Sequence, residues 1–279
     1  MFYLYKDIQI DEFDINLPFN KLTNMLSKSL KKFITSLNHK KFRKQYTAFF
    51  AEGDKLNHDL IGSEIQCSEL LATANWLNKN KKFLLKDIKI TEVTEPELKN
   101  ISNLKSPPPV IGIYKTGERQ LKAEELADSL ALALDGVQDP GNMGTIIRIA
   151  DWFGIKNIVC SENCADIHNP KVVQSSMGAI ARVAVDYTNL STFIEEYKQK
   201  TKLPVYGTFL EGENIYNQSL SKSGMIVMGS EGKGISPEIE KLISDKLFIP
   251  NFPTDEPTSE SLNVSVATAI VCSEFRRRG

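Results

Sequence analysis

Apolar residues recur along this chain with two periods, and the clearest change of period lies between residues 131 and 154. The apolar run Ala131–Leu134 predicts a buried strand. After a turn at residues 139–141, apolar residues at positions 146, 149, 150 and 153 keep the spacing of one buried helix face. Asn142 opens this predicted helix, and Arg148 lies off its apolar face. A strand, a polar loop and a helix form the unit in which α/β proteins bind ligands beyond the strand end.

Strand-like and helix-like patterns alternate through the rest of the chain. After residue 135 we expect strands at 157–160, 181–187, 205–208, 225–229 and 246–249, and helices at 170–179, 190–200, 236–243 and 261–275. Before residue 115 we expect strands at 49–53, 69–72, 88–93 and 110–114, and helices at 25–37, 54–61, 74–80 and 96–101. This alternation predicts an α/β fold, with a mainly parallel sheet in the C-terminal half and a smaller α/β module before it.

The composition is that of an ordinary globular protein. The 279 residues are 41% apolar and 25% charged, and no apolar run approaches the roughly 18 residues that span a membrane. We expect no secretion signal, because no basic stretch followed by an apolar stretch opens the chain. The four cysteines form no CxxC pair, which favours reduced thiols and a cytoplasmic location. Cys160, Cys164 and His168 lack a fourth ligand, so we expect no metal.

Charge is unevenly distributed, although the net charge is only −1. Between Met25 and Phe50 there are seven basic residues and no acidic ones, with Phe33, Phe42 and Tyr46 among them. This mixture suits a phosphate backbone better than a small metabolite, but a solvated amphipathic helix would show the same pattern. The basic residues are Lys28, Lys31, Lys32, Lys40, Lys41, Arg43 and Lys44.

Three segments carry candidate chemistry, and each follows a predicted strand. They are NMGTIIR at 142–148, MGSEGKG at 228–234 and SLNVS at 261–265, the last joined to Pro250 by a polar loop. The three glycines at 229, 232 and 234 permit a ligand to approach the backbone closely. The second segment matches neither GxxxxGK[ST] nor GxGxxG, which excludes the two common nucleotide loops. A tight turn followed by a helix cap at Ser236 remains the alternative.

In this order, the three segments resemble the signature motifs of the SpoU/TrmH family of RNA 2′-O-methyltransferases, in the SPOUT superfamily. The resemblance covers residues 130–279. Residues 25–115 resemble the ribosomal-protein-like RNA-binding domain often fused ahead of it, with SPPP at 106–109 in place of the usual Thr-Pro-Gln-Gly turn. The loop at 251–260 is longer than usual for the family. The implied domains are an extension at 1–24, a substrate RNA-binding domain at 25–115, a linker at 116–130 and the methyltransferase domain at 131–279.

The resemblance implies methyl transfer from S-adenosyl-L-methionine to a ribose 2′-hydroxyl of structured RNA, first of all ribosomal RNA. A transfer RNA substrate and a non-catalytic role in RNA binding or ribosome assembly are the alternatives. A dinucleotide-dependent oxidoreductase is disfavoured because GxGxxG is absent. The family also implies a trefoil knot in the C-terminal domain and a homodimer with the cofactor pocket near its interface. The last predicted helix, apolar on most sides, agrees with a partner subunit.

The resemblance also implies a role for each motif residue. Arg148 is expected to clamp an RNA phosphate and orient the 2′-hydroxyl; a role as base would require a strong perturbation, since guanidinium stays protonated. Asn142 is expected to position the RNA or Arg148, unless it only caps the helix. The residues expected around the target nucleotide are Glu231, Ser261 and Asn263. The residues expected to hold the cofactor, largely through backbone groups, are Thr208, Gly229, Ile249 and Leu262.

Overall fold

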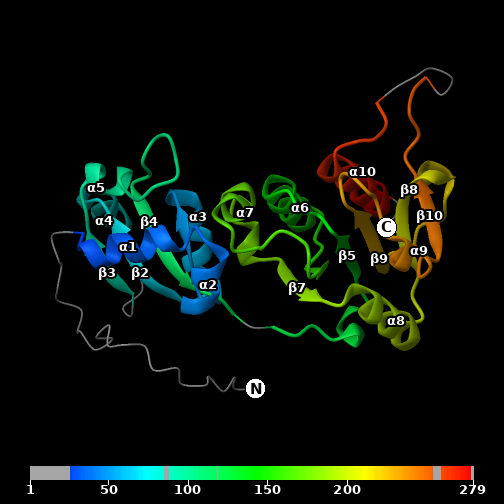
Figure 1. Cartoon of the computed structure of the whole chain (residues 1–279), viewed down its shortest axis with the longest axis horizontal. Coiled ribbons are helices and arrows are strands. Elements are labelled where there is room, and N and C mark those ends of the chain that lie inside the picture. Colours follow the sequence, from blue (N-terminus) through cyan, green and yellow to red (C-terminus); the bar gives the residue numbers. More distant parts are fainter. Residues whose placement is uncertain (1–25, 85–87, 118, 254–258, 278–279) are drawn as a thin grey trace.

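The computed structural model describes residues 26–84, 88–117, 119–253 and 259–277. The extension predicted at 1–24 lies outside the described residues, as do residues 254–258 of the long loop. The described chain forms two sheets with their helices, placed at opposite ends of the long axis (Figure 1). Among the described residues, no helix has both the length and the apolar character needed to cross a membrane.

The N-terminal sheet has the strand order β1-β4-β2-β3. Its strands are β1 (Ala48–Glu52), β2 (Cys67–Ala72), β3 (Lys89–Glu92) and β4 (Val110–Lys115), and its helices are α1 (Lys28–Ser36), α2 (Lys40–Tyr46), α3 (Asp54–Ile61), α4 (Ala74–Asn80) and α5 (Glu95–Lys99). β4 is antiparallel to β1 and β2, whereas β2 and β3 are parallel. All the strands and helices predicted here are present. Helix α2 was not predicted, because it buries only Arg43 and has no apolar period.

The C-terminal sheet has the order β10-β8-β9-β5-β6-β7, and every neighbouring pair is parallel, as predicted. Its strands are β5 (Leu130–Asp135), β6 (Asn157–Ser161), β7 (Ala184–Thr188), β8 (Val205–Asn214), β9 (Gly224–Gly229) and β10 (Asp245–Phe248). Its helices are α6 (Pro140–Trp152), α7 (Pro170–Ser175), α8 (Leu190–Thr201), α9 (Pro237–Glu240) and α10 (Val264–Arg277), with short 3₁₀ turns η1 (Ala123–Leu126), η2 (Ala179–Ala181) and η3 (Ile215–Asn217). The trefoil knot stays a prediction.

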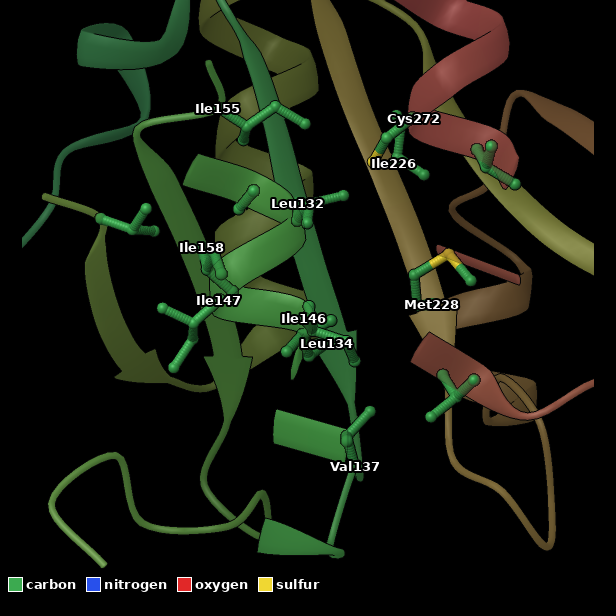
Figure 2. Close-up of a cluster of buried hydrophobic side chains, with 14 of the residues drawn as sticks. Leu132, Leu134, Val137, Ile146, Ile147, Ile155, Ile158, Ile226, Met228 and Cys272 are labelled. Carbon is green, nitrogen blue, oxygen red and sulfur yellow. The ribbon is translucent and has the colours of Figure 1, made fainter. Parts of the chain in front are cut away.

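The alternation of β5 divides the C-terminal core into two layers. On one face, Leu132 and Leu134 pack with α6 and α10, as the close-up of this cluster shows (Figure 2). On the other face, Ala131 and Ala133 pack with α8. The chain adds β6 and β7 on one side of β5 and then returns to place β8 and β9 on the other. The carboxyl ends of β5 and β9 therefore flank the point where an open parallel sheet binds its ligand.

Several predicted boundaries were wrong. Helix α6 begins at Pro140, because Asp139 accepts the N–H of the first turn, so Asn142 neither opens nor caps it. Helix α7 ends at Ser175, well before residue 179, and the turn through Gly178 (φ +93°) delays β7 to residue 184. Helix α10 begins at Val264 rather than at 261. The predicted linker is partly core, since Ala123 and Leu126 are fully buried against the α8 face of the sheet.

Candidate active site

Side chains from three distant segments meet at the carboxyl edge of the C-terminal sheet. Asn142 Nδ2 donates to Glu231 Oε1 at 2.7 Å. Asn142 Oδ1 accepts from Asn263 Nδ2 at 3.0 Å and from Ser265 Oγ at 2.9 Å. The partners are 89, 121 and 123 residues from Asn142 along the chain. Folding thus joins residues from all three motifs in a single hydrogen-bonded group, which we call the amide cluster: Asn142, Glu231, Asn263 and Ser265.

Helix α6 fixes the first member of the cluster. Asp139 Oδ1 accepts from the backbone N–H of Asn142 at 2.9 Å, and Lys171 Nζ lies 3.3 Å from Asp139 Oδ2. The hydrogen bond from Asn142, followed by the contact with Lys171, holds the pKa of Asp139 below its usual value. A Cβ on Gly144 would lie 2.6 Å from the Ser175 side chain, so only glycine lets α6 pack this closely on α7. The first turn of α6 is therefore held by an ionised cap and by close packing.

Helix α10 fixes the second member. Asn263 directly precedes this helix, and its Oδ1 accepts from the backbone N–H groups of Ser265 at 3.0 Å and Val266 at 3.4 Å. These are the N–H groups that lack partners in the first turn of a helix, so Asn263 caps α10. Its Nδ2 then points outward to Asn142.

The glycine-rich segment after β9 is a closed loop that presents Glu231. Ser230 and Gly234 exchange two backbone hydrogen bonds, both of 2.9 Å. A Cβ on Gly229 would lie 2.1 Å from the carbonyl carbon of Gly234, so this position requires glycine. Glycine is required at position 229 because the returning backbone at Gly234 packs against it. The sequence-based expectation had attributed the glycine to close approach of a ligand. Glu231 lies at the exposed tip of the loop.

Arg148 lies further along α6 and outside the amide cluster. Its side chain is exposed and forms no hydrogen bond or ion pair with any residue that the structure describes. An exposed, unpaired guanidinium can bind a phosphate through two parallel hydrogen bonds. Ser261 is likewise exposed, and the structure does not bring it into the cluster. Ser265 and Asp139 were missed as site residues, although Ser265 is part of the SLNVS segment and Asp139 precedes a proline at a helix start.

The four expected cofactor residues lie on or beside the last strands and the last helix: Thr208 on β8, Gly229 at the end of β9, Ile249 just after β10 and Leu262 shortly before α10. Thr208 Oγ1 lies 3.8 Å from Met228 Sδ on the neighbouring strand. Ile249 packs against the core cluster that contains Met228 and Val264. Leu262 remains 47% exposed just before α10. Apolar side chains and a hydroxyl are groups that suit the adenosine part of S-adenosyl-L-methionine.

The basic segment forms an exposed surface with one exception. The side chains of Lys28, Lys31, Lys32, Lys40, Lys41 and Lys44 are exposed on α1 and α2. Arg43 is only 3% exposed: its Nε and Nη2 donate to Asp166 Oδ2 at 3.1 and 2.6 Å, and its Nη1 donates to the carbonyls of Leu37 and Asn38. Its guanidinium connects the two halves of the chain, so the expectation that Arg43 contacts RNA is wrong. We call the remaining six residues the lysine surface.

The residues considered as metal ligands serve other contacts. Burial raises the pKa of the Cys160 thiol, whereas the hydrogen bond between the two thiols lowers the pKa of Cys164 to about 7. The ring of His168 stacks 4.7 Å from that of Phe49, and burial lowers its pKa to about 4. In the described part of the chain, no three His, Cys, Asp or Glu side chains are arranged to hold a metal ion.

Two protein-family models match most of this chain. Residues 129–273 match the sequence model of the SpoU rRNA Methylase family, and residues 30–112 match that of the MRM3-like substrate binding domain. The 23S rRNA (guanosine(2553)-2′-O)-methyltransferase RlmP of Bacillus subtilis is 28% identical over 241 residues, which cover 86% of this chain and 93% of that protein. The 23S rRNA (guanosine-2′-O-)-methyltransferase RlmB of Neisseria meningitidis is 31% identical over 176 residues, covering 61% and 68% of the two chains.

Two solved structures have similar folds over nearly the whole chain. A protein of the TrmH family of RNA methyltransferases from Porphyromonas gingivalis superposes with a TM-score of 0.82 at 40% identity, and the match covers 91% of this chain and 100% of that protein. An AdoMet-bound rRNA methyltransferase from Sinorhizobium meliloti superposes with a TM-score of 0.81 at 27% identity, covering 91% and 97%.

Proposed function

The chain belongs to the SpoU rRNA methylase family, and we propose that it methylates a ribose 2′-hydroxyl of ribosomal RNA at the amide cluster. It is an RNA 2′-O-methyltransferase that uses S-adenosyl-L-methionine. The observation that carries the proposal is the hydrogen-bonded meeting of Asn142, Glu231 and Asn263 at the ligand-binding edge of the sheet. The 23S rRNA activities in the names of the two relatives support ribosomal rather than transfer RNA as the substrate.

The reaction requires alignment more than covalent help from the protein. The sulfonium of the cofactor supplies a methyl group that is already electrophilic. We assign Arg148 to the phosphate beside the target ribose, where it keeps its charge and holds the hydroxyl in line. Among the clustered side chains, Glu231 can accept a proton without the strong perturbation that Arg148 would require. We therefore assign the 2′-hydroxyl proton to the Glu231 carboxylate, which Asn142 holds in place.

We assign the cofactor to the ends of β8, β9 and β10. Ile249 and Leu262 would cover its apolar parts, and Thr208 and the backbone after Gly229 would bind its polar atoms. Ser261 lies two residues before Asn263 in the sequence, and we place it beside the target nucleotide.

We propose that the lysine surface binds the RNA backbone. Its charge is not neutralised by acidic residues within α1 and α2, and the Phe42 and Tyr46 rings stack 6.2 Å apart among the lysines. Tyr46 is 37% exposed, so it can also contact a base.

We also propose that the enzyme is a homodimer and acts in the cytoplasm. On α10, Val266 is 50% exposed, Leu262 just before it is 47% exposed, and Ala269 and Ile270 are half-buried. These apolar side chains share one face at helical spacing, and a second copy of the chain would cover them. The four cysteines are unpaired, which agrees with a reducing compartment.

Mapping ribose methylation in total RNA with and without the protein tests the proposal. The expected result is one ribosomal position that loses its methyl group when the protein is removed. Arg148→Ala should abolish the activity and leave the affinity for S-adenosylhomocysteine within a few-fold. Lys222→Ala is the matched control, because Lys222 is an exposed cation just before β9, at the opposite edge of the sheet. Methylation of transfer RNA alone, or full activity in Arg148→Ala, would refute the assignment.

A further inference from the structure

Ser265 is a buried polar residue to which nothing above assigns a function. It lies in the first turn of α10, is 5% exposed, and places its hydroxyl 2.9 Å from Asn142 Oδ1 and 2.7 Å from Asn263 Oδ1. No other hydroxyl among the described residues contacts both asparagines. It therefore lies where the first and third motifs meet.

The backbone of α10 determines which way both amides point. Asn263 must turn its Oδ1 toward the helix, because the groups there are N–H donors. Asn263 Nδ2 must then face Asn142, and because Nδ2 is a donor, Asn142 must present its acceptor, Oδ1. As a result, Asn142 Nδ2 faces Glu231, and the Glu231 oxygen that it meets must act as an acceptor. The orientation of the cluster is thus set by helix capping and does not depend on an arbitrary choice between amide O and N.

Ser265 completes this arrangement at Asn142. The single hydroxyl proton of Ser265 is shared between Asn142 Oδ1 at 2.9 Å and Asn263 Oδ1 at 2.7 Å, so loss of the hydroxyl would leave Asn142 Oδ1 with Asn263 Nδ2 as its one described side-chain donor. The Asn142 amide would keep its hydrogen bonds to Asn263 and Glu231, but its last torsion is broad, so one hydrogen bond fewer fixes its orientation less tightly. The donor that holds the Glu231 carboxylate would then be less firmly positioned.

We propose that Ser265 is a positioning residue for methyl transfer, which holds the Asn142 amide and, through it, the Glu231 carboxylate. Ser265 itself touches neither cofactor nor RNA in this proposal. The inference rests on the proposed function, since it concerns the same site. It goes further in assigning part of the turnover rate to a hydroxyl inside the protein.

The test compares Ser265→Ala with Thr268→Val in the full-length protein. Thr268 is a matched control because its hydroxyl is also fully buried on α10 but donates to the Val264 carbonyl, away from Asn142. Under single-turnover conditions we expect Ser265→Ala to slow methylation about ten-fold, the effect of one lost hydrogen bond in the transition state. Its affinity for S-adenosylhomocysteine should stay within two-fold or so, and Thr268→Val should turn over like the wild type.

A double-mutant cycle separates positioning from general damage to the fold. If Ser265 acts through Asn142, then Ser265→Ala should have little further effect in an Asn142→Asp background, where the donor to Glu231 is already lost. Ser265→Thr, which keeps the hydroxyl, should restore most of the rate, and circular dichroism melting identifies a variant that fails to fold. Equal rates for Ser265→Ala and Thr268→Val, or additive effects in the cycle, would overturn the inference. Wild-type activity in the same assay shows that such a failure concerns Ser265 and not the proposed function.

Discussion

The Arg43–Asp166 ion pair allows a direct test of how the two halves of the chain are joined. Arg43 belongs to α2, and Asp166 lies in the loop between β6 and α7. Asp166→Asn keeps the size of the side chain and the acceptor for the His168 N–H at 3.1 Å, but it removes the charge. The variant therefore leaves a buried guanidinium without its counter-ion.

The burial of both partners sets the expected magnitude. The side chains of Arg43 and Asp166 are 3% and 17% exposed. Breaking a pair buried this deeply costs roughly 3–5 kcal/mol, because one charge remains uncompensated. Arg43 keeps its two bonds to the carbonyls of Leu37 and Asn38, so we expect the lower end, about 3 kcal/mol. For a chain of this length that corresponds to a fall in melting temperature of roughly 6–12 °C.

Scanning calorimetry at pH 7 measures the effect, with Asp59→Asn as the control. Asp59 also reaches across the interface, to Arg182 at 3.5 Å, but these side chains are 27% and 44% exposed. An ion pair this exposed contributes under about 1 kcal/mol. If Asp166→Asn melts like Asp59→Asn, then the buried pair does not hold the two parts together and the reasoning fails.

The pH dependence of the same variant gives a second check. Burial acts to raise the pKa of Asp166, but the hydrogen bonds and charge of Arg43 outweigh it and leave the pKa below the usual 3.8. A carboxyl group with a lowered pKa stabilises the fold above its unfolded value and loses that contribution as the pH falls through the folded value. The difference in stability between the wild type and Asp166→Asn should therefore persist at all pH values above 3.8 and become smaller only below that value.

Three further outcomes are expected. Burial lowers the pKa of His168 from 6.5 to about 4, so as the pH falls the unfolded chain binds a proton before the folded chain does. The free energy of unfolding of the wild type should therefore fall by at most about 3 kcal/mol between pH 6.5 and 4. In melts at acid pH, His168→Phe should lose less stability over the same range. Replacing the six residues of the lysine surface with Gln should weaken RNA binding and flatten its salt dependence; an unchanged slope in filter binding would assign them to ordinary solvated surface. Val266→Asp should yield monomers in sedimentation velocity. A variant that stays dimeric would show that the apolar face of α10 is not the dimer interface.

Most elements could be predicted from the sequence because local patterns determine them. The bounds of α3 and α4 follow from their apolar spacing and their flanking turns. At the start of α5, Thr94 caps the helix, and Glu97 three residues later closes a reciprocal capping box between neighbouring residues. The alternation of leucine and alanine in β5 likewise reports which face meets α6 and which meets α8.

The contacts between distant segments could not be predicted in the same way. Arg43 lies among six similar residues, and what separates it from them is Asp166, 123 residues away. The pattern of residues 261–275 is apolar enough to continue the helix backward, and only the capping by Asn263 shows where α10 begins. Only the resemblance grouped Asn142, Glu231 and Asn263 at one site, because no local period connects three segments so far apart. Their hydrogen bonds to one another, and the contact with Ser265, were not predicted.

The Asn263 amide must both cap α10 and donate to Asn142, and this limits which residues can replace it. Asparagine, aspartate and serine are about equally good at the start of a helix, so stability alone would tolerate all three at residue 263. Aspartate, however, has no proton to give to Asn142, and serine is too short to serve both sides at once. A screen that ranks substitutions only by thermal resistance would accept replacements here that the chemistry does not tolerate.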